Sequence, residues 1–447
     1  MVFSSFTFLL LFMPVVLLGY RLLPEKAKRP FLLLSSLVFY GWGSPAWLLL
    51  LMYIMGLDYA GGLLMKRFEP HKKGILAALI VLNLLPLAYF KYAVFLKDTA
   101  EWITGWRIAM QSPLLPAGIS FFTFQGISYL IDAYRGDAGE QKNFVRFGVY
   151  LSLFPQLVAG PIVRYTDLEA QLNQAPKADA AAARQGMRRF AVGLGKKVLL
   201  ADTMGRFWKI MSADLPAAGA LGAWLGLAAF SFQIFFDFAG YSDMALGLGK
   251  ALGFTFPENF DRPYRALSLT EFWRRWHMTL TTWFREYVYI PLGGNRRGEA
   301  RRNVNLMIVW ALTGLWHGAG WNFILWGVYF GVLLILEKKY VLGRPGIERT
   351  PGWLRQAGTY LLVLMGWGFF AGKWAVFPAM AGAYGLTTPG ALLNCLSYLP
   401  MLLLCAGISF LPRLSLPGRR FAAPILMALC LAALAAQGYE PFVYFQF

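Results

Sequence analysis

The stretch Val304–Leu336, VNLMIVWALTGLWHGAGWNFILWGVYFGVLLIL, is the clearest guide to the fold of this chain. Its 33 residues include no Lys, Arg, Asp or Glu. Basic residues flank both ends, Arg301 and Arg302 before the run and Lys338 and Lys339 after it. Because Lys- and Arg-rich loops stay on the cytoplasmic side of a membrane, the run requires an even number of passes. One helical pass needs about 20 apolar residues, so two complete passes do not fit.

Glycine residues near the middle of the run offer a way to reconcile its length with two passes. Gly314, Gly318 and Gly320 interrupt the apolar pattern there. Breaks in a membrane helix are tolerated where the irregular backbone lines a cavity in the protein. We therefore predict a pair of broken half-helices between Val304 and Leu336.

The composition extends this interpretation to the whole chain. Of the 447 residues, 57% are hydrophobic and 15% are charged. An ordinary soluble domain carries about 25% charged residues, so a large soluble protein is excluded. The net charge of +19 also fits nucleic-acid binding, but the basic residues lie in short loops between apolar runs, which favours a role in membrane orientation. We predict a single all-α membrane domain over residues 1–447, with about ten to twelve membrane-embedded segments.

The distribution of Lys and Arg predicts the orientation. The first apolar run, from Phe6 to about Leu18, has no basic residue before it and four soon after it, which places the N-terminus outside. Nine arginines between Arg262 and Arg302 place that segment in the cytoplasm. A last pass, from Phe421 to about Ala436, then leaves residues 437–447 outside.

Few residues are available for acid–base or metal chemistry. The chain has three cysteines without a CxxC pair and three histidines, so a disulfide framework or a metal centre is not expected. His317 follows Val304 by 13 residues, or about 20 Å of helix, which places it near the middle of the bilayer. An ionisable group at that depth is costly and usually functional, so His317 is the first catalytic candidate. The alternative is a neutral, hydrogen-bonded core histidine.

His277 is the second candidate. Ser268 and Glu271 have the spacing of a capping box, which predicts that a helix begins there. Aromatic residues then recur at steps of three and four and form one helical face, and arginines lie elsewhere. This pattern predicts an amphipathic helix in the membrane interface. His277 lies at the edge of the aromatic face, so it is either functional or anchors the helix to lipid headgroups.

Two acidic residues follow a long apolar run. Asp237 ends that run, and its carboxylate is suited to orient an imidazole and fix its tautomer. Asp243 is predicted instead to cap a following helix.

The segment 437–447 is aromatic and has no basic residue. One interpretation is an aromatic belt at the outer edge of the membrane. The other is a peptide that folds back into a cavity and offers the phenol of Tyr444 as an acyl acceptor.

Several motifs together resemble the membrane-bound O-acyltransferase (MBOAT) family. They are Gly118–Arg135, Phe154–Pro161, Phe236–Asp243, Glu271–His277 and Leu315–Gly318. The resemblance implies a ring of membrane helices around a central funnel, with His317 and His277 as the family's two functional histidines. It is strongest to the bacterial branch that O-acetylates secreted or cell-wall polysaccharides such as alginate, and proteins that acetylate peptidoglycan are similar.

This branch implies a route for the acyl group. An acetyl group from a cytoplasmic thioester, such as acetyl-CoA, would pass through the protein to an extracytoplasmic serine-esterase-like acetyltransferase. No bound cofactor is implied, and the location would be the bacterial inner membrane. The cytoplasmic arginines are suited to hold the phosphates of the donor. In the related D-alanyl system a separate peptide resembles Phe442–Phe447, and the presence of that motif within this chain favours the acetyl branch.

Two alternatives remain open at this point. One is D-alanyl transfer to teichoic acid. The other is a role without chemistry, as a transporter of lipid or sugar or as a scaffold. The lack of an internal repeat and the scarcity of acidic residues in the apolar segments argue against a transporter.

Overall fold

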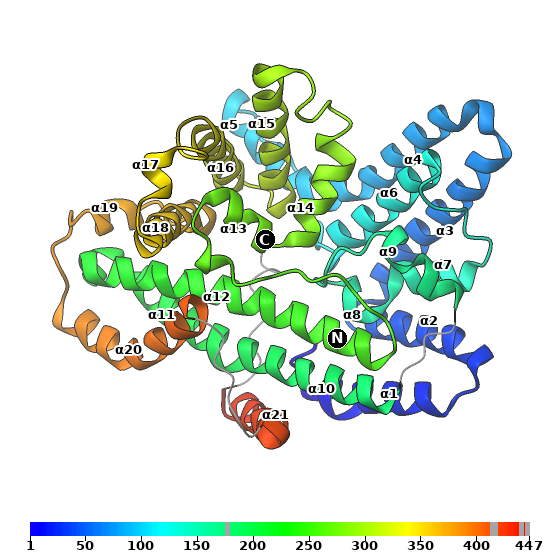
Figure 1. Cartoon of the computed structure of the whole chain (residues 1–447), viewed down its shortest axis with the longest axis horizontal. Helices are drawn as coiled ribbons and strands as arrows, with labels where there is room; N and C mark the ends of the chain where they lie inside the picture. Colours follow the sequence, from blue (N-terminus) through cyan, green and yellow to red (C-terminus); the bar gives the residue numbers. More distant parts are fainter. Residues whose placement is uncertain (175–178, 412–418, 438–441, 443–447) are drawn as a thin grey trace. The chain divides into compact units, whose positions relative to one another are not determined.

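The computed structural model describes residues 1–174, 179–411, 419–437 and 442, and every regular element in them is helical (Figure 1). The prediction of an all-α protein is therefore confirmed. The chain divides into two compact units, one of Met1–Val192 with Tyr241–Glu258 and one of Gly193–Gly240 with Asn259–Phe447. Helices α10 and α12 each contribute residues to both units.

The first unit is built mainly from the N-terminal helices. Helices α3, α4 and α6 pack against one another, and α2 packs against α7. The rings of Phe8, Phe12, Phe39 and Phe154 form an aromatic core, with centroids 5.3–6.3 Å apart. The elements are η1 (Thr7–Phe12), α1 (Met13–Leu22), α2 (Glu25–Gly41), α3 (Pro45–Arg67), η2 (Glu69–His71), α4 (Lys72–Leu87), η3 (Ala88–Tyr92), α5 (Ala93–Thr104), α6 (Ile119–Arg135), α7 (Phe144–Ser152), α8 (Phe154–Leu157), α9 (Tyr165–Asn173), most of α10 (Ala180–Gly195) and the last part of α12 (Leu215–Ala251).

The second unit contains both candidate histidines. Helix α16 packs against α13, α15 and α18, and α11 packs against α20. The elements are η4 (Lys196–Ala201), α11 (Asp202–Ala213), the first part of α12 (Leu215–Ala251), η5 (Pro263–Arg265), α13 (Leu269–Arg275), α14 (Met278–Phe284), η6 (Arg285–Tyr289), α15 (Gly298–His317), α16 (Trp321–Tyr340), α17 (Pro345–Glu348), α18 (Gly352–Ala371), α19 (Val376–Met380), α20 (Pro389–Phe410) and α21 (Arg419–Gln437).

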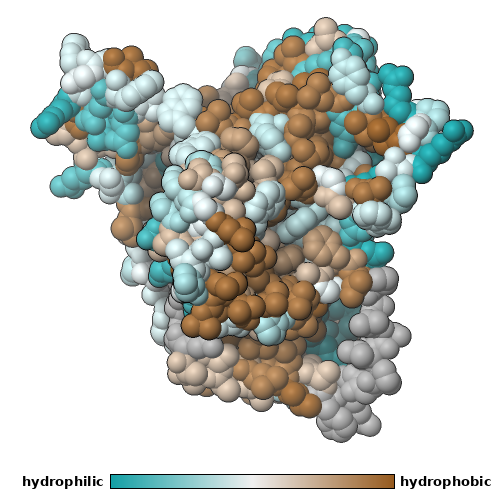
Figure 2. All heavy atoms as spheres, turned by 90° about the vertical axis from the view of Figure 1, so that its left-hand side faces the viewer, coloured by the Kyte–Doolittle hydropathy of each residue, from teal (hydrophilic) through white to brown (hydrophobic). Residues whose placement is uncertain are grey.

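Five helical stretches of the described chain are long and apolar enough to cross a membrane. They are Pro45–Arg67, Glu69–Thr104, Leu215–Ala251, Trp321–Tyr340 and Pro389–Phe410. Only 22% of the apolar window of the last is buried within the protein, which is the pattern expected of a helix that faces lipid. Figure 2 likewise shows apolar side chains over a broad area of one face. The ring around a funnel and the total of ten to twelve segments remain predictions.

The run between Val304 and Leu336 breaks into two helices at the predicted glycines, but the prediction that each is only a half-helix is wrong. Helices α15 and α16 have 20 residues each and are joined at Gly318–Gly320. Each helix is therefore about 30 Å long. The prediction failed because α15 begins at Gly298 and α16 continues to Tyr340, so both helices include the basic residues that we had assigned to loops.

Glycine lets α15 and α16 approach closely. A Cβ atom on Gly314 would lie 2.3 Å from the carbonyl oxygen of Phe323, and one on Gly327 would lie 2.3 Å from that of Trp310. Neither position has room for a side chain, so the two backbones pack directly, as small residues allow between membrane helices. This packing fixes the end of α15, where His317 lies.

Candidate active site

His317 is the last residue of α15, and its side chain is buried. Its Nδ1 lies 2.8 Å from the carbonyl oxygen of Thr313, one helical turn earlier. Because a carbonyl oxygen only accepts hydrogen bonds, Nδ1 must carry the hydrogen. Nε2 then holds the lone pair and is the basic nitrogen of this imidazole.

His277 lies at a break between two short helices. Helix α13 ends at Arg275, His277 has φ = +43°, and α14 begins at Met278. The prediction of one continuous interfacial helix is therefore wrong, although Ser268 does cap α13 by accepting from the backbone N–H of Glu271. His277 is only 2% exposed, which also excludes a role in anchoring to headgroups.

Asn259 holds the His277 imidazole. Its Oδ1 lies 3.1 Å from His277 Nδ1 and accepts from the N–H and Oγ1 of Thr279 at 3.3 and 2.9 Å. Since the N–H of Thr279 only donates, this Asn259 atom acts as an acceptor and His277 Nδ1 must donate to it. His277 Nε2 is then also unprotonated. It is buried and has no hydrogen-bond partner among the described residues.

Trp316 lies beside both imidazoles. Its ring centroid is 5.8 Å from that of His277 and 5.0 Å from that of His317. Phe238 of α12 meets the edge of His277 at 4.6 Å, and Trp326 of α16 contacts His317 at 4.8 Å. Both histidines therefore lie in one aromatic environment that limits the access of water.

Burial sets the charge of His277. Burial first, and then the nearby His317, hold the pKa of His277 well below its ordinary value of 6.5. Both causes disfavour the imidazolium form. His277 is accordingly a neutral acceptor at neutral pH.

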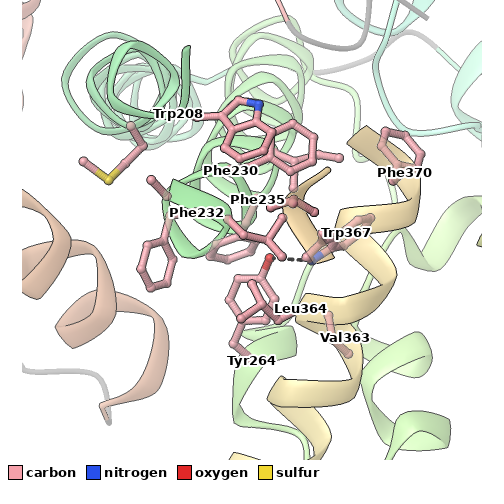
Figure 3. Close-up of a cluster of buried hydrophobic side chains, with 14 of the residues drawn as sticks. Trp208, Phe230, Phe232, Phe235, Tyr264, Val363, Leu364, Trp367 and Phe370 are labelled. Carbon is pink, nitrogen blue, oxygen red and sulfur yellow. Dashed lines mark hydrogen bonds between the residues drawn. The ribbon is translucent and has the colours of Figure 1, made fainter. Parts of the chain in front are cut away.

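A larger aromatic cluster lies beside this site. Figure 3 shows Trp208, Phe230, Phe232 and Phe235 of the α11–α12 side facing Tyr264 and the α18 residues Trp367 and Phe370. Trp367 Nε1 donates to the hydroxyl of Tyr264 at 3.2 Å, the bond dashed in the figure. Phe370 also contacts the His317 ring, with centroids 5.6 Å apart. The packing of this cluster thus connects α12 and α18 to the residues around His317.

Glu337 of α16 fixes the start of α13. Its carboxylate accepts from the backbone N–H groups of Leu269 and Thr270 at 2.6 and 2.8 Å, and from the Thr270 hydroxyl at 2.6 Å. The backbone N–H groups in the first turn of a helix have no hydrogen-bond partner within that helix. The α13 segment, and with it His277, is therefore tied to the same helix that packs against α15.

Asp237 makes its described contact with a buried lysine. Lys197 Nζ lies 2.8 Å from Asp237 and 2.7 Å from Asp202, and its side chain is 1% exposed. One partner of Asp237 is thus an ammonium group, and the prediction that Asp237 orients an imidazole stays a prediction. We refer to Lys197, Asp202 and Asp237 as the buried triad.

The expectation that Asp243 caps a new helix is wrong. Helix α12 continues through Asp237 and Asp243 to Ala251. Asp243 instead accepts from Arg189 Nε at 2.8 Å, and the same guanidinium binds both carboxylate oxygens of Glu258. We refer to Arg189, Asp243 and Glu258 as the exposed triad.

Tyr444 lies outside the described residues. Phe442, two positions earlier, is described and only 1% exposed. Its ring centroid is 4.6 Å from Lys197 Nζ. We had not singled out Lys197, Asn259 or Trp316 from the sequence. None of the three carries a local sequence signal, because each meets a residue at least 18 positions away in the chain.

The described residues contain no group of three or more His, Cys, Asp or Glu side chains placed to hold a metal.

Comparison with known proteins places these features in a family. Residues 137–377, which include both histidines, match MBOAT, the membrane-bound O-acyltransferase family. The probable alginate O-acetylase AlgI of Pseudomonas aeruginosa is 41% identical over 394 residues, covering 85% of this chain and 75% of that protein. Peptidoglycan O-acetyltransferase of Helicobacter pylori is 33% identical over 407 residues, covering 83% and 77%.

A more distant relative is the teichoic acid D-alanyltransferase of Bacillus subtilis, which is 28% identical over 270 residues, covering 57% of this chain and 68% of that protein. The matches to the O-acetylating proteins are both closer and longer. The chain belongs to the membrane-bound O-acyltransferase family and is a membrane acyltransferase.

Proposed function

We propose that this protein transfers an acetyl group from a cytoplasmic thioester, such as acetyl-CoA, for O-acetylation of an extracytoplasmic polysaccharide. The observation that carries the proposal is the pair of buried imidazoles beside Trp316, each with Nε2 as its basic nitrogen. The relatives that acetylate alginate and peptidoglycan support acetyl as the group and a polysaccharide as the final acceptor.

His317 is the proposed general base. A hydroxyl oxygen attacks the thioester carbonyl carbon, its proton passes to His317 Nε2, the C–S bond breaks and the sulfur leaves as a thiol after taking up a proton. The Thr313 carbonyl keeps the hydrogen on Nδ1 throughout, so the proton is taken up at Nε2. An imidazole is suited to this transfer because its pKa lies near neutrality.

His277 is proposed to bind and orient a reactant. A neutral imidazole with an unpaired Nε2 accepts a hydrogen bond from a hydroxyl or an amide N–H that enters the site. The aromatic residues around both histidines exclude water, which protects the thioester from hydrolysis. Asn259 fixes the ring so that this acceptor is preformed.

Tyr444 is the proposed first acceptor. A phenol has a pKa near 10, well below that of a sugar hydroxyl, so its ester forms readily and passes its acyl group onward. This protein would lie in the bacterial inner membrane. The second acceptor would be a serine-esterase-like transferase on the extracytoplasmic side. This assignment goes with both termini lying outside the cytoplasm. Cysteine labelling of intact cells with an impermeant thiol reagent checks this orientation. A cysteine in residues 380–390 should be labelled, and one in residues 296–302 should be shielded.

D-alanyl transfer is a weaker candidate, because the D-alanyltransferase relative aligns with only 57% of this chain. Transport without chemistry predicts no release of thiol from a labelled donor.

The test of the proposal is an assay of purified protein with labelled acetyl-CoA. We expect release of free CoA and a labelled peptide that contains Tyr444. Tyr444→Phe keeps the ring and removes the hydroxyl, so it should abolish the label and polymer acetylation in cells. Undiminished acetylation by this variant contradicts the relay, and the absence of thiol release from the unmodified protein contradicts the proposal as a whole.

A further inference from the structure

The buried triad is unusual in its place and its energy. A lysine that is 1% exposed is costly to keep charged, and here two carboxylates lie within 3 Å of its ammonium group. Such an arrangement demands a reason beyond stability, because apolar residues of similar size often stabilise a buried site as well.

A π-helical turn builds the triad. Element η4 is a π-helix, and the backbone N–H of Asp202 bonds to the carbonyl oxygen of Lys197 five residues earlier. This wider turn brings Asp202 over Lys197, while Asp237 approaches from α12. The backbones fit closely, because a Cβ on Gly240 would lie 2.7 Å from the carbonyl oxygen of Gly193 and 3.1 Å from the backbone nitrogen of Lys197. Single π-turns of this kind occur frequently at functional sites.

The C-terminal part of the chain meets the same π-helical turn at two points. A Cβ on Gly195 would lie 2.9 Å from the Leu426 side chain of α21, so α21 packs directly over the start of the turn. Beyond α21, the Phe442 ring lies over Lys197 Nζ at 4.6 Å. A cation over the face of an aromatic ring is attracted to its π-electrons, and the attraction is strongest when both are removed from water. Phe442 and Lys197 are both 1% exposed.

The triad is also adjacent to the candidate active site. Asp237 is followed in α12 by Phe238, and the Phe238 ring meets the edge of the His277 imidazole at 4.6 Å. A contact path therefore runs from Phe442 through Lys197 and Asp237 along α12 to His277.

We propose that the buried triad is a dock for the Phe442 ring and that this dock positions the segment carrying Tyr444 for acyl transfer. The inference rests on the proposed function, since it takes Tyr444 as the acceptor. Lys197 acts as a positioning residue that supplies the cation under the ring. Asp202 and Asp237 keep the lysine charged and pointed at Phe442.

The test uses the full-length protein with labelled acetyl-CoA and measures the label on the Tyr444 peptide. Phe442→Leu keeps an apolar side chain but removes the π-face, and it should lower the labelling rate by about 2- to 30-fold. The apparent KM for the donor should not change, because the dock presents the acceptor and does not bind the thioester. Replacing Phe442 with phenylalanine carrying one, two and three ring fluorines should lower the rate stepwise, which a merely apolar contact would not do.

Lys197 supplies the complementary variant. Lys197→Met should lower labelling to a similar extent, and adding Phe442→Leu to it should cause little further loss, since both changes remove one contact. Lys197→Arg retains a cation and should recover part of the rate. If Lys197→Met fails to fold, the fluorinated series still decides the question.

The matched control is Tyr134→Leu, which removes a cation–aromatic contact between Lys72 and Tyr134 in the first unit and should leave labelling unchanged. Labelling at the unmodified rate in Phe442→Leu and in the fluorinated proteins would overturn the dock while leaving the proposed function intact. Additive losses in the double variant, or a changed donor KM, would also overturn it. The absence of any thiol release from the unmodified protein would instead overturn the proposed function.

Discussion

The two triads contain the same kinds of group but differ in their exposure to water. In the exposed triad the exposed fractions are 32% for Arg189, 54% for Glu258 and 15% for Asp243. In the buried triad the exposed fractions are 1% for Lys197, 2% for Asp237 and 10% for Asp202. Helix α12 supplies one aspartate to each, six residues apart.

The difference indicates which triad serves function. An exposed ion pair is screened by water and contributes about 0–1 kcal/mol, so the exposed triad is well explained as a surface tie between helices. A buried cation must stay paired, because removal of a partner leaves a charge without solvation. The buried triad also lies beside Phe442 and one residue from Phe238, which contacts His277.

The largest expected effect is on the buried triad. Asp237→Ala removes one of the two carboxylates at Lys197 and should lower the free energy of unfolding by about 3 kcal/mol. Denaturant unfolding of the detergent-solubilised protein measures it. The matched variant is Asp243→Ala in the exposed triad. Equal effects of the two substitutions would show that burial does not distinguish the triads.

An intermediate effect is expected from acid, at the buried His277, which belongs to neither triad. The pKa of His277 is lowered in the folded protein, so the unfolded chain takes up a proton first as the pH falls. Neutral His277 therefore contributes fully to the free energy of unfolding above pH 6.5. This contribution is lost as the pH falls below 6.5, by up to about 1.4 kcal/mol per pH unit, until the pKa of His277 in the folded protein is reached. Unfolding of the protein and of His277→Gln between pH 7 and 5 checks this, and identical slopes would contradict the assignment.

The smallest effect is expected in the exposed triad. Arg189→Met should lower the free energy of unfolding by about 1 kcal/mol or less, and added salt should shrink the difference further. Thermal unfolding at low and high salt measures it. A loss that exceeds that of Asp237→Ala would reverse the comparison.

The sequence predicted the fold class better than it predicted the boundaries of helices, and the catalytic roles of the two histidines stay predictions. His317 was found because an ionisable residue stood out in a long apolar run, and Ser268 correctly marked the start of α13. The half-helices failed because charged residues in the first turn of α15 were counted as loop. The aromatic spacing around His277 hid a break, because a positive φ at a histidine leaves no trace in periodicity.

The contacts that define the site could not be predicted from the sequence, for a different reason. Asn259 meets His277 across 18 positions, and Lys197 meets Asp237 across 40. Such pairs depend on how helices pack. Ion pairs between distant residues have no spacing signature, unlike pairs three or four residues apart on one helix.

The most direct test of the central claim is the rate of thiol release from labelled acetyl-CoA by the His317→Ala protein. Loss of a general base should lower this rate by about 10²- to 10⁴-fold. The matched control is His71→Ala, which removes an exposed histidine in η2 and should leave the rate unchanged. A His317→Ala protein that releases thiol as fast as the His71→Ala protein would contradict the assignment of His317 as the base.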